Sequence, residues 1–245
     1  MQRLLYALVF AASFAFSSQA SADQNDFEQC RQIFAEQNPP VVLQPQAKET
    51  RALCFTAFAV LHSGQSHTPL YVAERLNRNT LQAAHQKRKD KFFADARLPR
   101  AERAELDDYK GSGYDRGHMA PAADMTTPES MAQSFSLANM VPQAPVNNRK
   151  AWAKIEKATR KYVLRAQGDV YVITGPVFDT VPSTIGSNRV WVPKHLFKLV
   201  YDPSTNKAWA HWIDNQDVAK AGAPISYTEL VKRTGISFLP NYRGS

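Results

Sequence analysis

The chain has 245 residues, of which 44% are hydrophobic, and this length supports one sizeable core but not several independent domains. Its 30 basic and 22 acidic residues give a formal net charge of +8, which suits an anionic partner such as nucleic acid, an anionic membrane or an acidic glycan. Ordinary solubility would explain the same charge, so charge alone does not select the partner. No internal repeat, low-complexity tract or long linker interrupts the chain, and a single domain is predicted over residues 23–245.

Residues 1–22 are predicted to be a signal peptide rather than part of the core. Arg3 is followed by an apolar run from Leu4 to Phe16 and then by small residues that end in Ala22, with cleavage expected before Asp23. A membrane anchor is the alternative, but the run is too short to span a bilayer comfortably. No later segment is apolar enough to span. The mature protein is therefore expected to be exported, either periplasmic or secreted, without a membrane anchor.

The chain contains two cysteines, Cys30 and Cys54. In an oxidising compartment an isolated pair is expected to form a disulfide. Closing a loop of this size stabilises a fold by roughly 3 kcal/mol. A zinc site has weaker support, because no Cys-x-x-Cys or His-x-x-x-His spacing accompanies the pair.

The first half of the chain is predicted to combine helices with a hairpin. Residues 26–37 are expected to be helical, and Pro39 and Pro40 end this helix. Residues 54–62 and 69–76 flank the turn residues Gly64, Gln65 and Ser66, which predicts a β-hairpin. A basic, irregular stretch is expected at 75–91, and a short helix at 101–109 leads into the glycine-rich residues 111–113.

Two further helices are predicted in the middle of the chain. Thr127 and Pro128 have the residue types of an N-cap and a first helical position. Asn147 or Asn148 is expected to open a longer helix, which ends at Gly168. Its apolar positions recur at helical spacing. The opposite face is basic and contains Arg149, Lys150, Lys154, Lys157, Arg160, Lys161 and Arg165.

The last third of the chain is predicted to be rich in strands. Short runs of β-branched and aromatic residues occur at 170–174, 190–193, 196–202 and 207–213. Ser226 and Glu229 have the spacing of a capping box, and the helix that they begin should end at Gly235. Because strands and helices mix without a regular βαβ alternation, the predicted fold class is α+β.

The segment from Tyr114 to Met125 carries the chemistry. It places Asp115, Arg116 and His118 within four residues, with a glycine between the last two. Imidazole is the usual general base near neutral pH, and a guanidinium can stabilise the charge of a phosphate under attack. A loop histidine that is hydrogen-bonded to Asp115 is the alternative, and spacing alone does not exclude it.

The sequence DRGHMAPAADM in this segment resembles the signature of the DNA/RNA non-specific endonucleases, the ββα-metal nucleases that include secreted bacterial nucleases and mitochondrial endonuclease G. The resemblance continues in SLANMVPQ at 136–143, NNRKAWAKIE at 147–156, VYVITGPV at 170–177 and VPKHLFK at 192–198. It covers most of the chain from about residue 69. It implies a mixed, largely antiparallel sheet with flanking helices and a ββα-metal active-site motif.

The resemblance also implies roles for individual residues. His118 matches the general base, Asn148 the metal ligand, and Glu156 the acid that holds metal-bound water. Asn139 matches a supporting asparagine and Arg116 the arginine of the motif. The family uses a second, upstream arginine near the transition state, and an R-x-x-x-F-x-x-D spacing selects Arg88 for it, with Phe92 and Asp95 as the other two positions.

The helical periodicity agrees with this assignment. Asn148, Trp152 and Glu156 are spaced at i, i+4 and i+8, so they form a stripe along one side of the helix. An N-cap is the alternative role for Asn148. A single direct protein ligand suits Mg²⁺, which keeps most of its waters, with Mn²⁺ as the alternative ion. Zinc would normally recruit more histidine or cysteine.

The expected function is therefore that of an exported, magnesium-dependent endonuclease. It would hydrolyse phosphodiester bonds of DNA and RNA without sequence specificity and leave 5′ phosphates. The nucleic-acid backbone would bind the basic helix face through Lys150, Lys154, Lys157 and Lys161. A phosphodiesterase for small substrates and a non-catalytic nucleic-acid-binding protein are the two alternatives.

Overall fold

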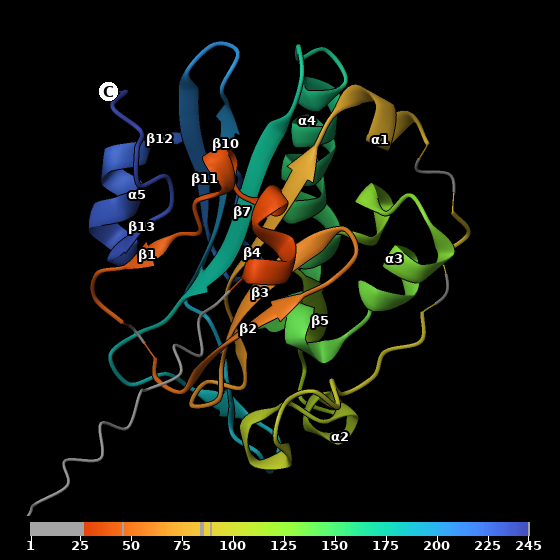
Figure 1. The fold of residues 1–245 in the computed structure, drawn as a ribbon. Helices are drawn as coiled ribbons and strands as arrows, with labels where there is room; N and C mark the ends of the chain where they lie inside the picture. Colours follow the sequence, from red (N-terminus) through yellow and green to blue (C-terminus); the bar gives the residue numbers. More distant parts are fainter. Residues whose placement is uncertain (1–26, 46, 84–85, 89, 245) are drawn as a thin grey trace, which may run out of the picture.

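The computed structural model describes residues 27–45, 47–83, 86–88 and 90–244 (Figure 1). The predicted signal peptide lies outside the described residues. Within the described part, no helix is both long enough and apolar enough to cross a membrane.

A seven-stranded sheet forms the centre of the fold, and every pair of neighbouring strands in it is antiparallel. The strand order is β12-β11-β10-β7-β4-β3-β2. This architecture confirms the predicted α+β class and the largely antiparallel sheet. The strands, in chain order, are β2 (Thr50–Cys54), β3 (Phe58–Ser63), β4 (Thr68–Leu76), β7 (Val170–Val177), β10 (His195–Asp202), β11 (Lys207–Asp214) and β12 (Ile225–Ser226).

Both faces of the sheet are covered, which explains why its central strands are apolar on both sides. Along β3, Phe58 and Val60 belong to one core cluster, whereas Ala59 and Leu61 belong to another. Successive side chains of a strand point to opposite faces, so the two clusters lie on opposite sides of the sheet. A sheet that is buried on both sides has nearly continuous hydrophobic strands, and β3 is of this kind.

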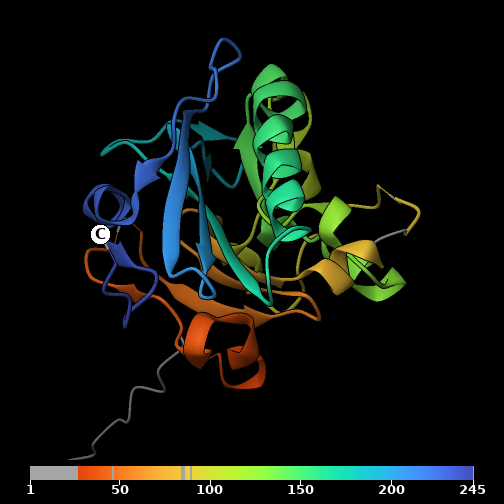
Figure 2. The same cartoon turned by 90° about the horizontal axis from the view of Figure 1, so that it is seen from above.

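Helix α4 (Ala153–Val163) covers one face of the sheet, and η1 (Glu28–Ile33) and α5 (Tyr227–Thr234) cover the other (Figures 1 and 2). Ile155 of α4 packs in the same cluster as Val60, and Leu230 of α5 packs in the same cluster as Leu61. As predicted, Ser226 caps α5 by accepting a hydrogen bond from the Glu229 amide, and Gly235 ends it with a left-handed φ of 68°.

Smaller elements surround this central layer. Three two-stranded sheets pair β1 with β13, β5 with β6 and β8 with β9. Their strands are β1 (Val41–Val42), β13 (Ile236–Ser237), β5 (Asp115–His118), β6 (Met140–Gln143), β8 (Thr184–Ile185) and β9 (Val190–Trp191). The remaining helical segments are η2 (Ala35–Gln37), α1 (Arg78–Gln82), η3 (Arg100–Glu102), α2 (Leu106–Tyr109), η4 (Ala122–Asp124), α3 (Pro128–Gln133), η5 (Leu137–Asn139) and η6 (Asn147–Trp152).

Several predicted boundaries in the first half are wrong. The expected N-terminal helix is two 3₁₀ segments with a kink, because Cys30 has non-helical dihedral angles. Residues 54–62 are not one strand: Cys54 ends β2, and the amide of Phe55 bonds the carbonyl of Phe58 across a tight turn. The stretch expected to be irregular contains α1, which Asn77 caps.

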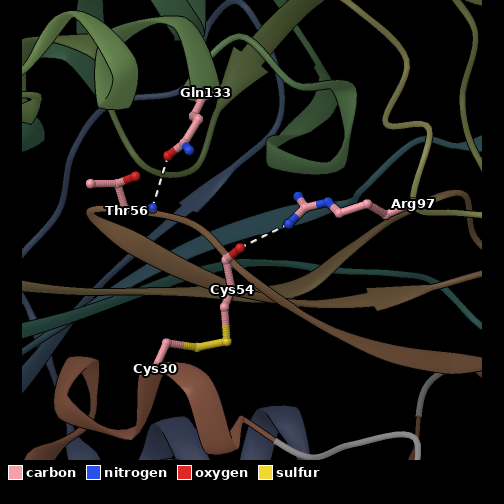
Figure 3. The surroundings of a disulfide bond; sticks show 5 residues. All are labelled: Cys30, Cys54, Thr56, Arg97 and Gln133. Carbon is pink, nitrogen blue, oxygen red and sulfur yellow. Dashed lines mark hydrogen bonds between the residues drawn. A yellow bond between two sulfur atoms is a disulfide. The ribbon is translucent and has the colours of Figure 1, made fainter.

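The predicted disulfide is present and joins η1 to the end of β2 (Figure 3). The Cα atoms of Cys30 and Cys54 are 5.7 Å apart. The carbonyl of Cys54 also accepts a 2.8 Å hydrogen bond from Nη1 of Arg97. The disulfide therefore fixes the N-terminal 3₁₀ segment to the edge strand β2, to which Arg97 also bonds.

Replacing both Cys30 and Cys54 with serine is expected to lower the free energy of unfolding by roughly 3 kcal/mol, because the closed loop restricts the unfolded chain. Denaturant titration of the variant and the wild type measures this difference. Treatment of the wild-type protein with an alkylating reagent should also leave its mass unchanged by mass spectrometry, because it has no free thiol. Two reactive thiols in the folded protein would contradict the disulfide.

Candidate active site

Strands β5 and β6 form a short hairpin-like pair that holds the DRGH segment. Gly117 of β5 is opposite Val141 of β6, and a Cβ atom at Gly117 would clash with the buried side chain of Gln143. Only glycine therefore allows this close pairing. His118 is the last residue of β5, so the pairing fixes the position from which its side chain enters the site.

The imidazole of His118 lies against two phenylalanine rings. Its ring centroid is 5.0 Å from that of Phe135 and 5.8 Å from that of Phe92. Burial, and after it the positive charge of Arg88, lowers the pKa of His118 to about 3, against an opposing effect of Asp90. Nε2 has no hydrogen-bond partner among the described residues. The ring is therefore neutral at pH 7, as a general base must be, and Asp115 does not hold it.

Asn139 supports the backbone directly after His118. Its Oδ1 accepts a hydrogen bond from the amide of Ala120, and its Nδ2 donates to the carbonyls of Ala120 and Ser134, each at 2.9 Å. The side chain is fully buried and does not line the cavity described below. Its three hydrogen bonds hold the backbone that follows His118.

The helix that carries Asn148 begins earlier than expected and is wider at its start. Val146 already has helical dihedral angles, and η6 is a π-helical segment that precedes α4. Asn148 therefore lies inside the helix and is not its N-cap. Its Nδ2 donates a 2.9 Å hydrogen bond to Oδ2 of Asp115. Because the amide nitrogen is used in this way, Oδ1 is left as the acceptor that can bind a cation.

Arg149 was not predicted to be part of the site. It binds Asp115 with two hydrogen bonds, 2.9 Å from Nε to Oδ2 and 2.6 Å from Nη2 to Oδ1. The carboxylate of Asp115 thus accepts hydrogen bonds from both Asn148 and Arg149, which limits the rotation of the Asn148 amide. The acid at position 115 was visible in the motif, but the sequence carries no signal for its pairing with a residue 34 positions away.

Glu156 lies two helical turns after Asn148 and lines the same cavity. Burial is the main cause that raises its pKa to about 7; the positive charges of Lys198 and Arg160 oppose this rise, and the charge of Asp124 adds to it. The carboxyl group therefore lies in a poorly solvated place near other charges. Such a position is typical of functional carboxylates.

The cavity has a volume of about 770 Å³ and brings five of the predicted residues together. These five are Arg88, Arg116, His118, Asn148 and Glu156. The guanidinium carbon of Arg116 lies 4.2 Å from the centroid of the Phe92 ring, and that of Arg88 lies 5.4 Å from the centroid of Phe135. Arg88 also forms an ion pair with Asp90. Another part of the lining comes from α2 and the residue after it, which the sequence did not indicate: Leu106, Asp107, Tyr109 and Lys110.

The donor set around this cavity fits Mg²⁺ better than Zn²⁺. The described residues contain no group of three or more histidine, cysteine, aspartate or glutamate side chains that could hold a metal ion. Zinc needs such a set. The residues that do fit a largely hydrated cation are Asn148, through its free Oδ1, and Glu156, whose carboxyl group lines the same space.

The predicted nucleic-acid-binding lysines lie beside the cavity rather than in it. Arg149, Ala153 and Glu156 line the cavity. Lys154, Lys157 and Lys161 are exposed and lie roughly 100° further around α4, and Lys150 is exposed in η6. The cavity and the lysines thus form adjacent stripes on one helix.

Comparison with known proteins identifies the family. The model of the DNA/RNA non-specific endonuclease family matches residues 40–244. Nuclease C1 from Cunninghamella echinulata var. echinulata is 31% identical over 202 residues, which are 74% of this chain and 80% of that protein. Human mitochondrial endonuclease G is 34% identical over 174 residues, 66% of this chain and 55% of that protein.

Human mitochondrial nuclease EXOG is 34% identical over 164 residues, which are 62% of this chain but 44% of that protein. The match therefore spans less than half the length of this relative. A solved structure of a complex of EndoG with EndoGI has the same fold, with a TM-score of 0.70 and 24% identity over 77% of this chain and 85% of the other. Since the family model covers most of the sequence, the chain belongs to the DNA/RNA non-specific endonuclease family.

Proposed function

We propose that this protein is an exported, magnesium-dependent endonuclease that hydrolyses phosphodiester bonds of DNA and RNA without sequence specificity. The observation that carries the proposal is the shared cavity. It joins a neutral imidazole at His118, the free amide oxygen of Asn148, the carboxyl group of Glu156 and the guanidinium groups of Arg88 and Arg116. This set can supply a base, a cation site and positive charge for a phosphate.

In the proposed mechanism, the neutral ring of His118 removes a proton from the attacking water. Arg116 and Arg88 neutralise the phosphate as negative charge develops on it. The 3′ oxygen leaves, so the products carry 5′ phosphates. Loss of the His118 base or of the positive charge would slow the chemical step more than it would weaken substrate binding.

Asn148 would hold Mg²⁺ through Oδ1, and Glu156 would hold water molecules around the ion. When bound, the ion would supply Lewis-acid stabilisation of the developing charge. Asp115 and Arg149 would fix the Asn148 amide so that its oxygen faces the ion. Mn²⁺ has similar ligand preferences and is the expected substitute.

The exposed lysines beside the cavity would hold the substrate through its backbone. Replacing Lys157 and Lys161 together with alanine is expected to raise KM on DNA and RNA alike and to lower its dependence on salt. Each lost phosphate contact should reduce the log–log salt slope on duplex DNA by about 0.9. The turnover at saturating substrate should change little, because these side chains lie outside the cavity.

KM measured against salt, for the wild type and the double variant on both polymers, tests this prediction. If the KM of the wild type does not depend on salt concentration, the lysines are exposed to solvent but do not bind the substrate. A defect confined to one base sequence would contradict backbone recognition.

The function itself is tested by incubating the pure protein with plasmid DNA, RNA and a small phosphodiester, with and without EDTA. The proposal expects cleavage of both polymers, slow or no cleavage of the small diester, and loss of all cleavage with EDTA. Rapid cleavage of the small diester would support a small-substrate phosphodiesterase. Binding without cleavage would support a non-catalytic nucleic-acid-binding protein.

Export is part of the proposal. Its support is the apolar start of the sequence at residues 4–16 and the Cys30–Cys54 disulfide, which is stable in an oxidising compartment. Fractionation of cells that produce the full chain should find the mature protein in the periplasm or the medium, with an N-terminus at Asp23.

A further inference from the structure

The cavity is larger than one phosphate and its cation need. Its volume of about 770 Å³ is in the range that encloses a ligand of many atoms. Part of its lining takes no part in the proposed hydrolysis and comes from α2 and the turn that leads from α2 to β5. We call this part the α2 wall; it consists of Leu106, Asp107, Tyr109, Lys110 and Tyr114.

The turn between α2 and β5 is held by the hydroxyl group of Ser112. Gly111 and Gly113, on either side of it, have left-handed φ angles of 68° and 81°, which glycine adopts without strain. Oγ of Ser112 donates a 2.9 Å hydrogen bond to the carbonyl of Tyr109 and accepts one of 3.2 Å from the amide of Tyr114. The turn therefore fixes Tyr114 relative to α2.

Helix α2 is in turn anchored to the rest of the fold by Asp108, which is 1% exposed. Its carboxylate accepts a 2.8 Å hydrogen bond from the amide of Glu105 at the start of the helix. It also accepts hydrogen bonds of 3.0 Å from the amide and 2.8 Å from Nδ2 of Asn188. The α2 wall is therefore a fixed surface whose shape is present before a substrate binds.

The ring of Tyr114 is suited to stacking. It is half-buried and packs against the apolar cluster that contains Tyr109, Met140 and Val192. The remainder of the side chain lines the cavity. An aromatic ring that is supported by the core and accessible from a cavity can stack with a nucleobase of any type.

The charges that line the cavity leave one cation of the α2 wall without a partner. Two of the cavity's arginines are ion-paired, in the pairs Arg88–Asp90 and Arg149–Asp115. Among the described residues, Lys110 and Arg116 form no ion pair. Arg116 is assigned to the scissile phosphate. Lys110, which is exposed at the end of α2, is therefore available for a second phosphate.

We propose that the α2 wall is a subsite for the nucleotide next to the scissile phosphate in a single strand. The base stacks on Tyr114, and Lys110 binds the phosphate on the far side of that nucleotide. A base inside a duplex already stacks on its neighbours, so the subsite favours single-stranded DNA and RNA. Neither contact reads a base edge, which agrees with cleavage that ignores sequence. The inference rests on the proposed cleavage beside His118.

Binding of a short, fluorescein-labelled oligothymidine to the full mature protein in EDTA, measured by fluorescence anisotropy, tests the stacking contact. Tyr114→Ala should raise Kd by roughly 5- to 150-fold, the range that loss of one stacked base costs. Tyr114→Phe keeps the ring and should bind like the wild type. On a duplex of the same length, Tyr114→Ala should change Kd much less, because the bases stay paired.

The phosphate contact is tested by the salt dependence of the same Kd. Lys110→Ala should reduce the log–log salt slope on the oligothymidine by about 0.7, the contribution of one phosphate on a single strand. Lys232→Ala and Tyr171→Ala are the matched controls and should change neither readout. Lys232 is exposed on α5, on the other face of the sheet, and Tyr171 is a half-buried tyrosine of β7 that does not line the cavity.

The ring of Tyr114 also packs against the core, so Tyr114→Ala could fail to fold. Tyr114→Leu then replaces it, because leucine fills the space beside the cluster without a ring. It should also weaken binding of the oligothymidine, whereas Tyr114→Phe should not.

Wild-type affinity in the variant without a ring, an equal loss in Tyr114→Phe, or an equal loss on the duplex overturns the proposal. An unchanged salt slope in Lys110→Ala, or a wild type that does not bind the oligothymidine, overturns it as well. Since these measurements need no cleavage, they decide the subsite even if the wild type cleaves no nucleic acid. Binding without cleavage would count against the proposed function alone.

Discussion

His118→Ala is expected to reduce kcat on DNA and RNA by about 10²–10⁴-fold, the range that loss of a general base typically costs. KM should stay close to that of the wild type, because the phosphate contacts are assigned to other side chains. The low pKa of His118, about 3, means that its ring is neutral at every pH at which the enzyme would be assayed. The defect should therefore be equally large from pH 6 to pH 9.

His67→Ala is the matched control, because this imidazole lies on a turn and bonds only the carbonyl of Ala101 among the described residues. Its kcat should be unchanged. Steady-state kinetics on plasmid and RNA, with thermal unfolding of each variant as a check on folding, give the comparison. Activity of His118→Ala within a few-fold of the wild type would remove this residue from the mechanism.

Asn148→Ala is expected to abolish turnover at low Mg²⁺ and to raise the Mg²⁺ concentration needed for half-maximal activity. Loss of an outer partner of a metal ligand typically costs about 10–100-fold in metal affinity or activity, and loss of the single protein ligand should cost more. Folding should be little affected, because the Asn148 side chain does not cap its helix and its hydrogen bond among the described residues is to the half-buried Asp115. Mg²⁺ titrations of nuclease activity measure the effect.

Asn79→Ala serves as the control, because Asn79 is an exposed asparagine of α1 that does not line the cavity; this variant should keep the wild-type Mg²⁺ dependence. If Asn148→Ala shows the same half-maximal Mg²⁺ concentration as the wild type, the cation is held elsewhere. Asp115 would then be the next ligand to consider, since Arg149 is its remaining partner.

Local patterns predicted those parts of the fold that local interactions determine. The turn at residues 64–66, the Thr127 cap of α3 and the Ser226 and Gly235 ends of α5 all lie where the sequence indicates them. These features depend on residues a few positions apart, so a short window contains their cause. The disulfide was also predictable, because the chain contains no other cysteine with which Cys30 or Cys54 could pair.

Features that depend on distant contacts were not predictable in the same way. The π-helical start of the helix at Asn147 arises where this segment meets Asp115 and Asp214, through hydrogen bonds of 2.9 Å from Asn148 and 2.8 Å from Asn147. The second wall of the cavity comes from α2, whose sequence carries no recognisable motif. Lys198 appears in the sequence as one basic residue in an apolar strand, and only the structure shows that its ammonium group is buried between Thr174 and the Trp152 ring.

The most direct test of the account is the treatment of a supercoiled plasmid with the purified mature protein at a series of Mg²⁺ concentrations, with sequencing of the new ends. Open-circular and then linear and fragmented DNA is expected only when Mg²⁺ is present, with 5′ phosphates at cuts spread over the whole sequence. Cleavage that persists in EDTA, or cuts confined to one sequence motif, would contradict it.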